Sequence, residues 1–132
     1  MVSVIINHFK IRKLEYYLVK LYIFLIIYVY SMITCDFCIL PVGNDGSECK
    51  KFVTAAVQSI KDSGLNYQLT GMGTLIEAES YEELYSAISK AQEEVFKQGI
   101  NRVYTVIKID DRRDLSKRGL NEKVNTVNKM LK

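Results

Sequence analysis

The segments that follow Met32 predict an α+β fold with strands and helices in the order β-α-β-β-α-β, plus a C-terminal helix. Three observations support this order: strand-like runs that end at turn residues, helix-like runs with apolar residues three and four apart, and a glycine-rich turn between the two middle strands. Right-handed crossovers then give an antiparallel sheet of order 4-1-3-2 with both main helices on one face. This arrangement is a ferredoxin-like sandwich.

The first strand and the first helix are expected within residues 33–64. Residues 33–40 are mostly β-branched, aromatic or otherwise apolar and are followed by Pro41-Val42-Gly43, which predicts a strand and then a turn. Ser63-Gly64 is a helix stop signal. The apolar residues between turn and stop recur at helical spacing: Phe52, Val53, Ala56, Val57 and Ile60.

A hairpin and a second helix follow. Residues 67–70 and 74–79 are short strands on either side of Gly71-Met72-Gly73. Ser80 and Glu83 have the spacing of a capping box, in which the serine oxygen accepts an amide hydrogen three residues on and the glutamate reaches back. The remaining elements are a helix with Leu84, Ala87, Ile88, Ala91 and Val95 on one face, a strand over residues 102–110, and an amphipathic helix with Leu120, Val124, Val127 and Leu131.

Residues 1–31 differ in composition from the rest of the chain. Residues 21–30 are an unbroken apolar and aromatic run after a basic segment. A membrane anchor needs about 20 apolar residues, a length that requires the inclusion of Lys20 and Ser31 here. A secretion signal needs a small-residue cleavage site, which the residues around Ser31 do not supply. The third alternative is that translation begins at Met32 and the upstream residues are an over-extended gene prediction.

Length and charge predict one domain and disfavour nucleic-acid binding. At 132 residues there is room for one core, so we expect an N-terminal extension, residues 1–31, and one domain, residues 32–132. The net charge of +3 lies wholly in the extension, and the domain balances 14 basic against 14 acidic side chains. A neutral domain has no clustered basic face for a partner nucleic acid.

Histidine and cysteine usage argue against common catalytic and metal sites. The single histidine is His8, in the extension, so the domain lacks a histidine for nucleophilic catalysis or metal binding. Cys35 and Cys38 are three residues apart on a strand, so their side chains point to opposite faces and cannot close on one ion. We therefore predict no catalytic residue and no metal ligand.

The open face of the sheet, which is the face without helices, is where we expect function. The more apolar alternate residues of the first strand, Ile33, Cys35, Phe37 and Ile39, should face the helices. The open face then mixes apolar and charged residues: Leu40, Leu75, Tyr104 and Val106 with Asp36, Glu77, Arg102 and Lys108. A solvated face would be more uniformly polar, so we expect it to pack on another copy in a homodimer or homotetramer.

Four stretches stand out in their order along the chain: Leu40-Pro41-Val42-Gly43, Gly71-Met72-Gly73-Thr74-Leu75-Ile76-Glu77-Ala78-Glu79, Ile107-Lys108-Ile109-Asp110-Asp111-Arg112-Arg113-Asp114 and Lys123-Val124. Together they resemble the thiamine-binding-protein-like family of small ferredoxin-like proteins. The resemblance covers roughly residues 32–132. Gly71 stands where that family usually has proline, and Ala78 where it usually has glycine.

The resemblance implies that the chain binds thiamine or its hydroxymethylpyrimidine moiety, with no other cofactor. Asp36 or Glu77 could pair with the amino group and ring nitrogen, and Tyr104 could stack on the ring. Thr74 follows a glycine that allows a ligand close to the backbone, although strand alternation places Thr74 and Glu77 on opposite faces. Arg112 could clamp a phosphate or a carboxylate, or its charge run could be self-paired and solvated.

Two other classes of function stay open. One is an enzyme that uses Asp36 and Glu77 as a carboxylate pair, and the other is a structural or regulatory oligomer without a ligand. The two carboxylates could instead pair with Arg102 and Lys108 across the sheet. We expect a cytoplasmic protein, which would be membrane-anchored only if residues 1–31 are translated.

Overall fold

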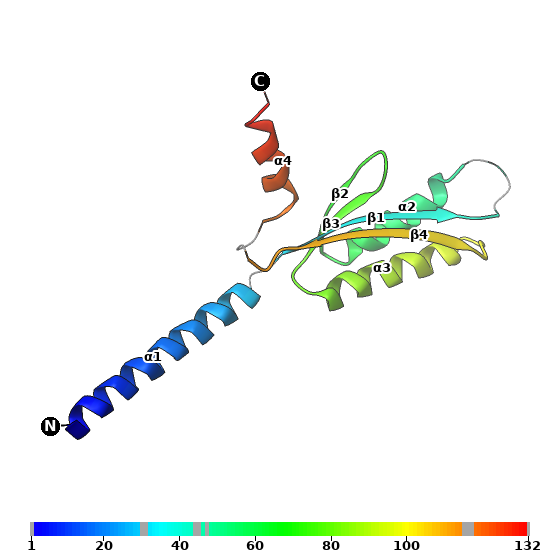
Figure 1. Ribbon diagram of the computed structural model, residues 1–132. Helices are drawn as coiled ribbons and strands as arrows, with labels where there is room; N and C mark the ends of the chain where they lie inside the picture. The colour runs from blue at the N-terminus through cyan, green and yellow to red at the C-terminus, as the bar shows by residue number, and fades with distance from the viewer. Residues whose placement is uncertain (1, 30–31, 44–45, 47, 115–117, 132) are drawn as a thin grey trace.

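The computed structural model describes residues 2–29, 32–43, 46, 48–114 and 118–131. Figure 1 shows four strands side by side, with α2 and α3 against one face and with α1 and α4 extending away from the sheet. The elements in chain order are α1 (Val2–Val29), β1 (Ile33–Pro41), α2 (Lys50–Asp62), β2 (Asn66–Leu69), β3 (Thr74–Ala78), α3 (Tyr81–Phe96), β4 (Val103–Asp111) and α4 (Leu120–Asn128).

The sheet has the predicted topology. Its strand order is β2-β3-β1-β4, which is the predicted order seen from the other edge, and every neighbouring pair is antiparallel. β1 lies against β4 over its whole length but against β3 only through residues 33–37. The ferredoxin-like prediction is confirmed.

The core lies between the sheet and the two helices α2 and α3. The alternate residues of β1 that were expected to face the helices are all buried. On β4, Thr105 shares their face, because it lies opposite Ile39 and accepts a hydrogen bond from Gln92 Nε2 of α3 at 2.8 Å. The largest fully buried side chains are Phe37, Ile60, Ile76, Leu84, Val95 and Cys35.

The predicted helix signals are present at α2 and α3. Ser80 Oγ accepts a hydrogen bond from the Glu83 amide at 3.2 Å, as in a capping box. The Glu83 carboxylate reaches one residue further back than expected, to the Glu79 amide at 3.1 Å. After α2, Gly64 has a φ of +78°, a backbone conformation that glycine adopts more readily than other residues.

The last helix is shorter than predicted and packs on nothing along most of its length. It ends at Asn128, so Leu131 lies beyond it, and none of its residues is buried. Val124 and Val127 are 53% and 57% exposed. The apolar stripe that predicted the helix therefore faces solvent in the single chain.

The N-terminal extension is a helix whose described side chains, in residues 12–25, are all exposed. It runs away from the sheet, and β1 begins at Ile33 (Figure 1). Lys20 lies over the Tyr16 ring, with 4.8 Å between Nζ and the ring centroid. No helix in the described parts of the chain, α1 included, has the length and apolar content that a membrane crossing requires.

Candidate functional site

The open face carries a shallow pocket at the end of β1 that is nearer the N-terminus. This open-face pocket has a volume of about 230 Å³. Strands β1, β3 and β4 form its floor, and the first residue of α4 forms part of its rim. Its lining residues are Thr34, Cys35, Asp36, Leu75, Lys108, Ile109, Asp110 and Leu120.

Asp36 and Lys108 form an ion pair in this pocket. They lie directly opposite each other on β1 and β4, with 2.6 Å between Lys108 Nζ and Asp36 Oδ2. The hydrogen bond from Lys108 to Asp36 and the charge of that carboxylate raise the pKa of Lys108. The Asp36 side chain is 31% exposed, so a ligand in the pocket has access to it. The alternative prediction that Asp36 pairs with Lys108 across the sheet is confirmed.

A glycine allows the hairpin turn to approach Asp36. A Cβ atom placed on Gly73 would lie 2.6 Å from Asp36 Oδ1 and 3.1 Å from the Phe37 carbonyl oxygen. Both distances are shorter than ordinary contacts, so a larger residue at position 73 would displace the carboxylate or the turn. The sequence suggested that the glycine before Thr74 lets a ligand come close to the backbone. In the structure, the group that comes close to this glycine is the Asp36 carboxylate.

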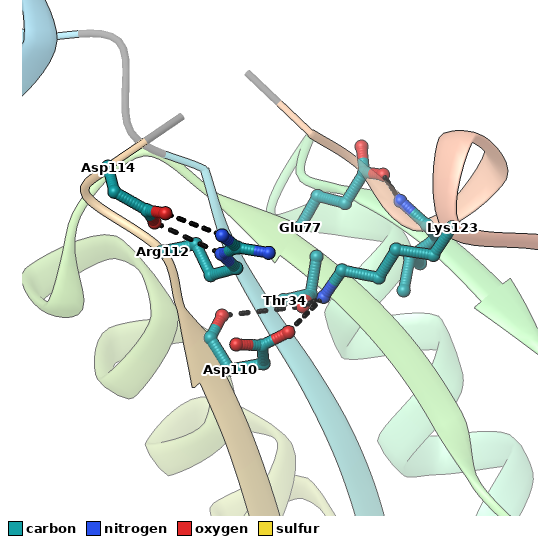
Figure 2. A network of polar contacts seen from close by, with 7 residues as sticks. Thr34, Glu77, Asp110, Arg112, Asp114 and Lys123 are labelled. Carbon is teal, nitrogen blue, oxygen red and sulfur yellow. Dashed lines mark hydrogen bonds and ion pairs between the residues drawn. The ribbon is translucent and has the colours of Figure 1, made fainter. Parts of the chain in front are cut away.

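Beside the pocket, Lys123 joins α4 to the sheet (Figure 2). Its Nζ atom donates to Thr34 Oγ1 and to Asp110 Oδ2, each at 2.6 Å. The Thr34 hydroxyl donates in turn to the Asp110 carbonyl oxygen at 3.4 Å. Thr34 is only 5% exposed although it lies on the open face. The hydrogen bond and the charge of Lys123 lower the pKa of Asp110, and its slight burial opposes the shift.

Glu77 holds the first turn of α4. Its Oε1 atom accepts a hydrogen bond from the Leu120 amide at 2.5 Å, and its Oε2 atom accepts one from Asn66 Nδ2 at 2.6 Å. A Cβ atom on Gly119 would clash with this carboxylate, so the glycine permits the helix to begin there. Both carboxylate oxygens of Glu77 are therefore already in use within the chain, one by α4 and one by Asn66.

The charge run after β4 is largely paired within itself. Arg112 donates to both carboxylate oxygens of Asp114, from Nε at 3.0 Å and from Nη2 at 2.5 Å (Figure 2). Arg113 donates to Asp111 Oδ2 at 2.9 Å, and the Tyr81 hydroxyl donates to the same oxygen at 3.2 Å. The structure therefore agrees with the alternative in which the charges of this run pair with one another. The Nε and Nη2 side of the Arg112 guanidinium is therefore occupied by Asp114.

The structure separates the remaining predicted site residues. Thr74 lies opposite Phe37 on the helix-covered face and is buried, as strand alternation predicted. Tyr104 is on the open face and 58% exposed, but it lies opposite Leu40. It is four positions from Lys108 along β4, which is about 13 Å. One small ring cannot touch both Tyr104 and Asp36 of a single chain.

The sequence argument did not identify the residues that join α4 to the pocket. Lys123 appeared only in a stretch of family resemblance, Leu120 only as an apolar residue of the last helix, and Asn66 was given no role. Their partners lie far away in the chain, because Lys123 is 89 positions from Thr34 and Leu120 is 43 from Glu77. Local periodicity carries no signal for such contacts.

The cysteines behave as the strand alternation predicted. Cys35 is buried on the helix-covered face, and Cys38 is half-buried on the open face. Burial, with a smaller contribution from the charge of Asp36, raises the pKa of the Cys35 thiol to about 11. In the described part of the chain, no three His, Cys, Asp or Glu side chains are grouped to hold a metal ion.

Comparison with known sequences connects this chain to one family. A family model described as "Thiamine-binding protein" matches residues 35–128. A UPF0045 protein of Methanothermobacter thermautotrophicus is 45% identical over 96 residues, which cover 73% of this chain and 96% of that protein. The UPF0045 protein YqgV of Bacillus subtilis is 40% identical over 105 residues, which cover 76% of this chain and 98% of that protein.

Solved structures share the fold. The hypothetical protein MJ1052 of Methanocaldococcus jannascii superposes with a TM-score of 0.65 at 26% identity, over 74% of this chain and 96% of that one. TM0486 of Thermotoga maritima, described as a candidate thiamine biosynthesis/salvage protein, gives a TM-score of 0.61 at 20% identity. That match covers 73% of this chain and 98% of TM0486, and at this identity it shows the fold alone.

Proposed function

Because the chain belongs to the thiamine-binding protein family, we propose that it is a non-enzymatic binding protein for thiamine or its hydroxymethylpyrimidine moiety, held in the open-face pocket. The family name refers to binding and names no reaction. The observation that carries the proposal is the pocket itself, in which a partly exposed carboxylate lies beside an ammonium group, a hydroxyl and apolar side chains.

The side chains of the pocket suit an aminopyrimidine. The Asp36 carboxylate accepts hydrogen bonds only, so it complements an exocyclic amino group and a protonated ring nitrogen. The Lys108 side chain is 73% exposed, so it has room to turn aside or to donate to a ring substituent. Leu75 and Leu120 also line the pocket and offer apolar contacts to the ring.

The size of the pocket favours one ring. Its volume of about 230 Å³ lies below the roughly 300–1,000 Å³ of pockets for drug-sized ligands. The pyrimidine moiety would therefore occupy the pocket, and the remainder of thiamine would extend along the open face.

We extend the proposal to an oligomer that is formed through this face. Leu40, Tyr104 and Val106 are exposed further along the open face, and a second copy packed on them would bury an apolar surface. A two-fold axis through Val106 would place Tyr104 of the second copy near Lys108 and Asp36 of the first. The aromatic surface that is missing beside Asp36 in one chain would then come from the other.

The geometry disfavours a carboxylate-based enzyme. Such an enzyme would need Asp36 and Glu77 to act together on a substrate. Both oxygens of Glu77 already accept hydrogen bonds, one from the Leu120 amide and one from Asn66. Glu77 therefore holds the start of α4. A binding function requires only the accessible carboxylate of Asp36.

Calorimetric titration with thiamine and with hydroxymethylpyrimidine tests the proposal. Wild-type protein should bind one of them with micromolar affinity or better, about −8 kcal/mol. Asp36→Ala removes the acceptor and should weaken binding by about 1–3 kcal/mol, roughly 5- to 150-fold. Glu93→Ala, at an exposed position of α3 on the opposite side of the sheet, is the matched control and should bind as wild type.

The wild-type titration tests the ligand, and the Asp36→Ala titration tests the place where it binds. A wild-type titration that gives no heat with either compound, and no competition with a labelled one, discards the pyrimidine ligand. Binding that is equally strong in Asp36→Ala keeps the ligand but removes it from the open-face pocket.

A further inference from the structure

Helix α1 is the part of the chain that the proposed function leaves unexplained. Its described side chains, in residues 12–25, are all exposed, and the helix leads away from the sheet (Figure 1). The match to the family begins at residue 35, so it does not include α1. The role of this helix therefore has to follow from its own residues.

The two halves of α1 differ in charge. Residues 10–20 hold four basic side chains and one acidic side chain, Glu15. Residues 21–29 carry no charge and are all apolar or aromatic. The helix thus joins a basic segment to an apolar segment, end to end. The basic side chains are those of Lys10, Arg12, Lys13 and Lys20.

The apolar segment, residues 21–29, is exposed on every side where its side chains are described. Residues 21–25 are between 49% and 67% exposed, and five consecutive positions of an α-helix pass once around its circumference. A protein groove, or a second α1 in a coiled coil, would cover one side of such a helix and leave the rest in water. Lipid surrounds a helix and covers all sides at once.

The length of the apolar segment limits how it can lie in a bilayer. Residues 21–29 form about 14 Å of helix. The hydrocarbon core of a bilayer is about 30 Å thick, so the segment is roughly half as long as the core. It therefore fits within one leaflet.

The tyrosine and lysine side chains of α1 suit the headgroup region. Tyr16, Tyr17 and Tyr22 are more than half exposed, and tyrosine is enriched where lipid meets water. Lys20 lies over the Tyr16 ring, and its long stem can place the ammonium group among lipid phosphates. Each basic side chain near the surface favours an anionic lipid over a neutral one.

The connection to the domain allows this position. α1 ends at Val29 and β1 begins at Ile33. The three residues between them can span up to about 10 Å, and helices at a membrane interface are buried by about 5–10 Å. The domain can therefore stay in water while α1 lies in the leaflet.

We propose that α1 binds the surface of an anionic lipid bilayer and holds the domain there. The helix lies at a tilt, with residues 10–20 among the headgroups and residues 21–29 in the outer part of the acyl chains. The basic segment selects anionic lipid, and the apolar segment supplies the part of the binding that does not depend on charge. This interaction surface is separate from the open-face pocket.

Flotation of the full chain with preformed vesicles tests the proposal. One set of vesicles is phosphatidylcholine alone, and the other contains about 30% phosphatidylglycerol, which makes its surface negative. Partition onto the anionic vesicles should be at least tenfold stronger. Salt at about 1 M should remove that preference, because it shortens the screening length to about 3 Å.

Variants of the full chain assign the binding to α1. Ile23→Glu places a charge in the apolar segment and should weaken binding to both kinds of vesicle at least tenfold. Lys13→Glu combined with Lys20→Glu should abolish the preference for anionic vesicles. Val124→Glu, the same kind of change at an exposed position of α4, is the matched control and should bind as wild type. Asp36→Ala should also bind as wild type, which separates this proposal from the ligand proposal.

Three results would overturn the proposal. Wild-type protein that floats with neither kind of vesicle, or equally with both at low salt, does so directly. An equal loss of binding in Val124→Glu and Ile23→Glu places the binding surface outside α1. An oligomer that shrinks in Ile23→Glu, without vesicle binding by the wild type, assigns α1 to contact with another copy. If Ile23→Glu fails to fold, the wild-type comparison of the two vesicles still decides.

Discussion

Replacing Glu77 with glutamine should detach α4 and leave the sheet intact. The helix has nine residues, none of them buried, and isolated helices shorter than about 12–15 residues are marginal in water. Its position therefore depends on two polar attachments. One is the Glu77 carboxylate on the Leu120 amide, and the other is Lys123 on Thr34 and Asp110.

The size of the effect follows from the contacts that are lost. A hydrogen bond to a charged group contributes about 1.5–3 kcal/mol net, and a carboxylate at a helix N-terminus about 0.3–1 kcal/mol. Glutamine keeps the shape and one acceptor oxygen, and the site is partly exposed. We therefore expect a loss of about 1–2 kcal/mol, which is a 5- to 30-fold shift toward detached α4.

Hydrogen exchange followed by NMR measures this shift residue by residue. Amides of α4 should exchange 5- to 30-fold faster in Glu77→Gln, while amides of β1 and β3 exchange as in the wild type. Glu93→Gln on α3 is the matched control. Unchanged exchange in α4, or equal acceleration in α4 and β1, would refute the anchoring role of Glu77.

Three further predictions address the rest of the molecule. Residues 32–132 alone should fold, with a free energy of unfolding within about 0.5 kcal/mol of that of the full chain, because the described side chains of α1 are exposed. Aggregation of this truncated protein, or the lack of a cooperative melt, would show that α1 contributes to folding. Tyr104→Asp or Val106→Lys should shift the oligomer toward monomer in sedimentation, an idea that fails if the wild type is monomeric at micromolar concentration. Because Lys123 lowers the pKa of Asp110, this pair should stabilise α4 above pH about 4 and lose that effect as the pH falls through the lowered pKa. Asp110→Asn should abolish that acid-induced change in the α4 amide shifts.

The fold was predictable because its signals are local. The alternation along β1 is clean enough to assign both faces of the sheet, and the capping box at Ser80 fixes the start of α3. Strand order followed from the short hairpin and the two crossovers. Each of these features involves residues that are close together in the sequence.

The candidate site was predictable only in part, because alternation gives the face of a residue and not its distance from others. Asp36 and Tyr104 share the open face, yet register places them opposite Lys108 and Leu40, well apart along β1 and β4. The use of Glu77 by α4 depends on a contact between residues 43 positions apart in the sequence. Such contacts produce no periodic pattern in the sequence, so only the structure shows them.

Native mass spectrometry of the purified full chain tests the central claim most directly, because it reports assembly and bound ligand together. With hydroxymethylpyrimidine or thiamine present, we predict an even-numbered oligomer that carries up to one ligand for each open-face pocket. The same experiment on Asp36→Ala should show the oligomer with the added mass reduced or lost. A monomer without added mass, or an added mass that is unchanged in Asp36→Ala, would contradict the account.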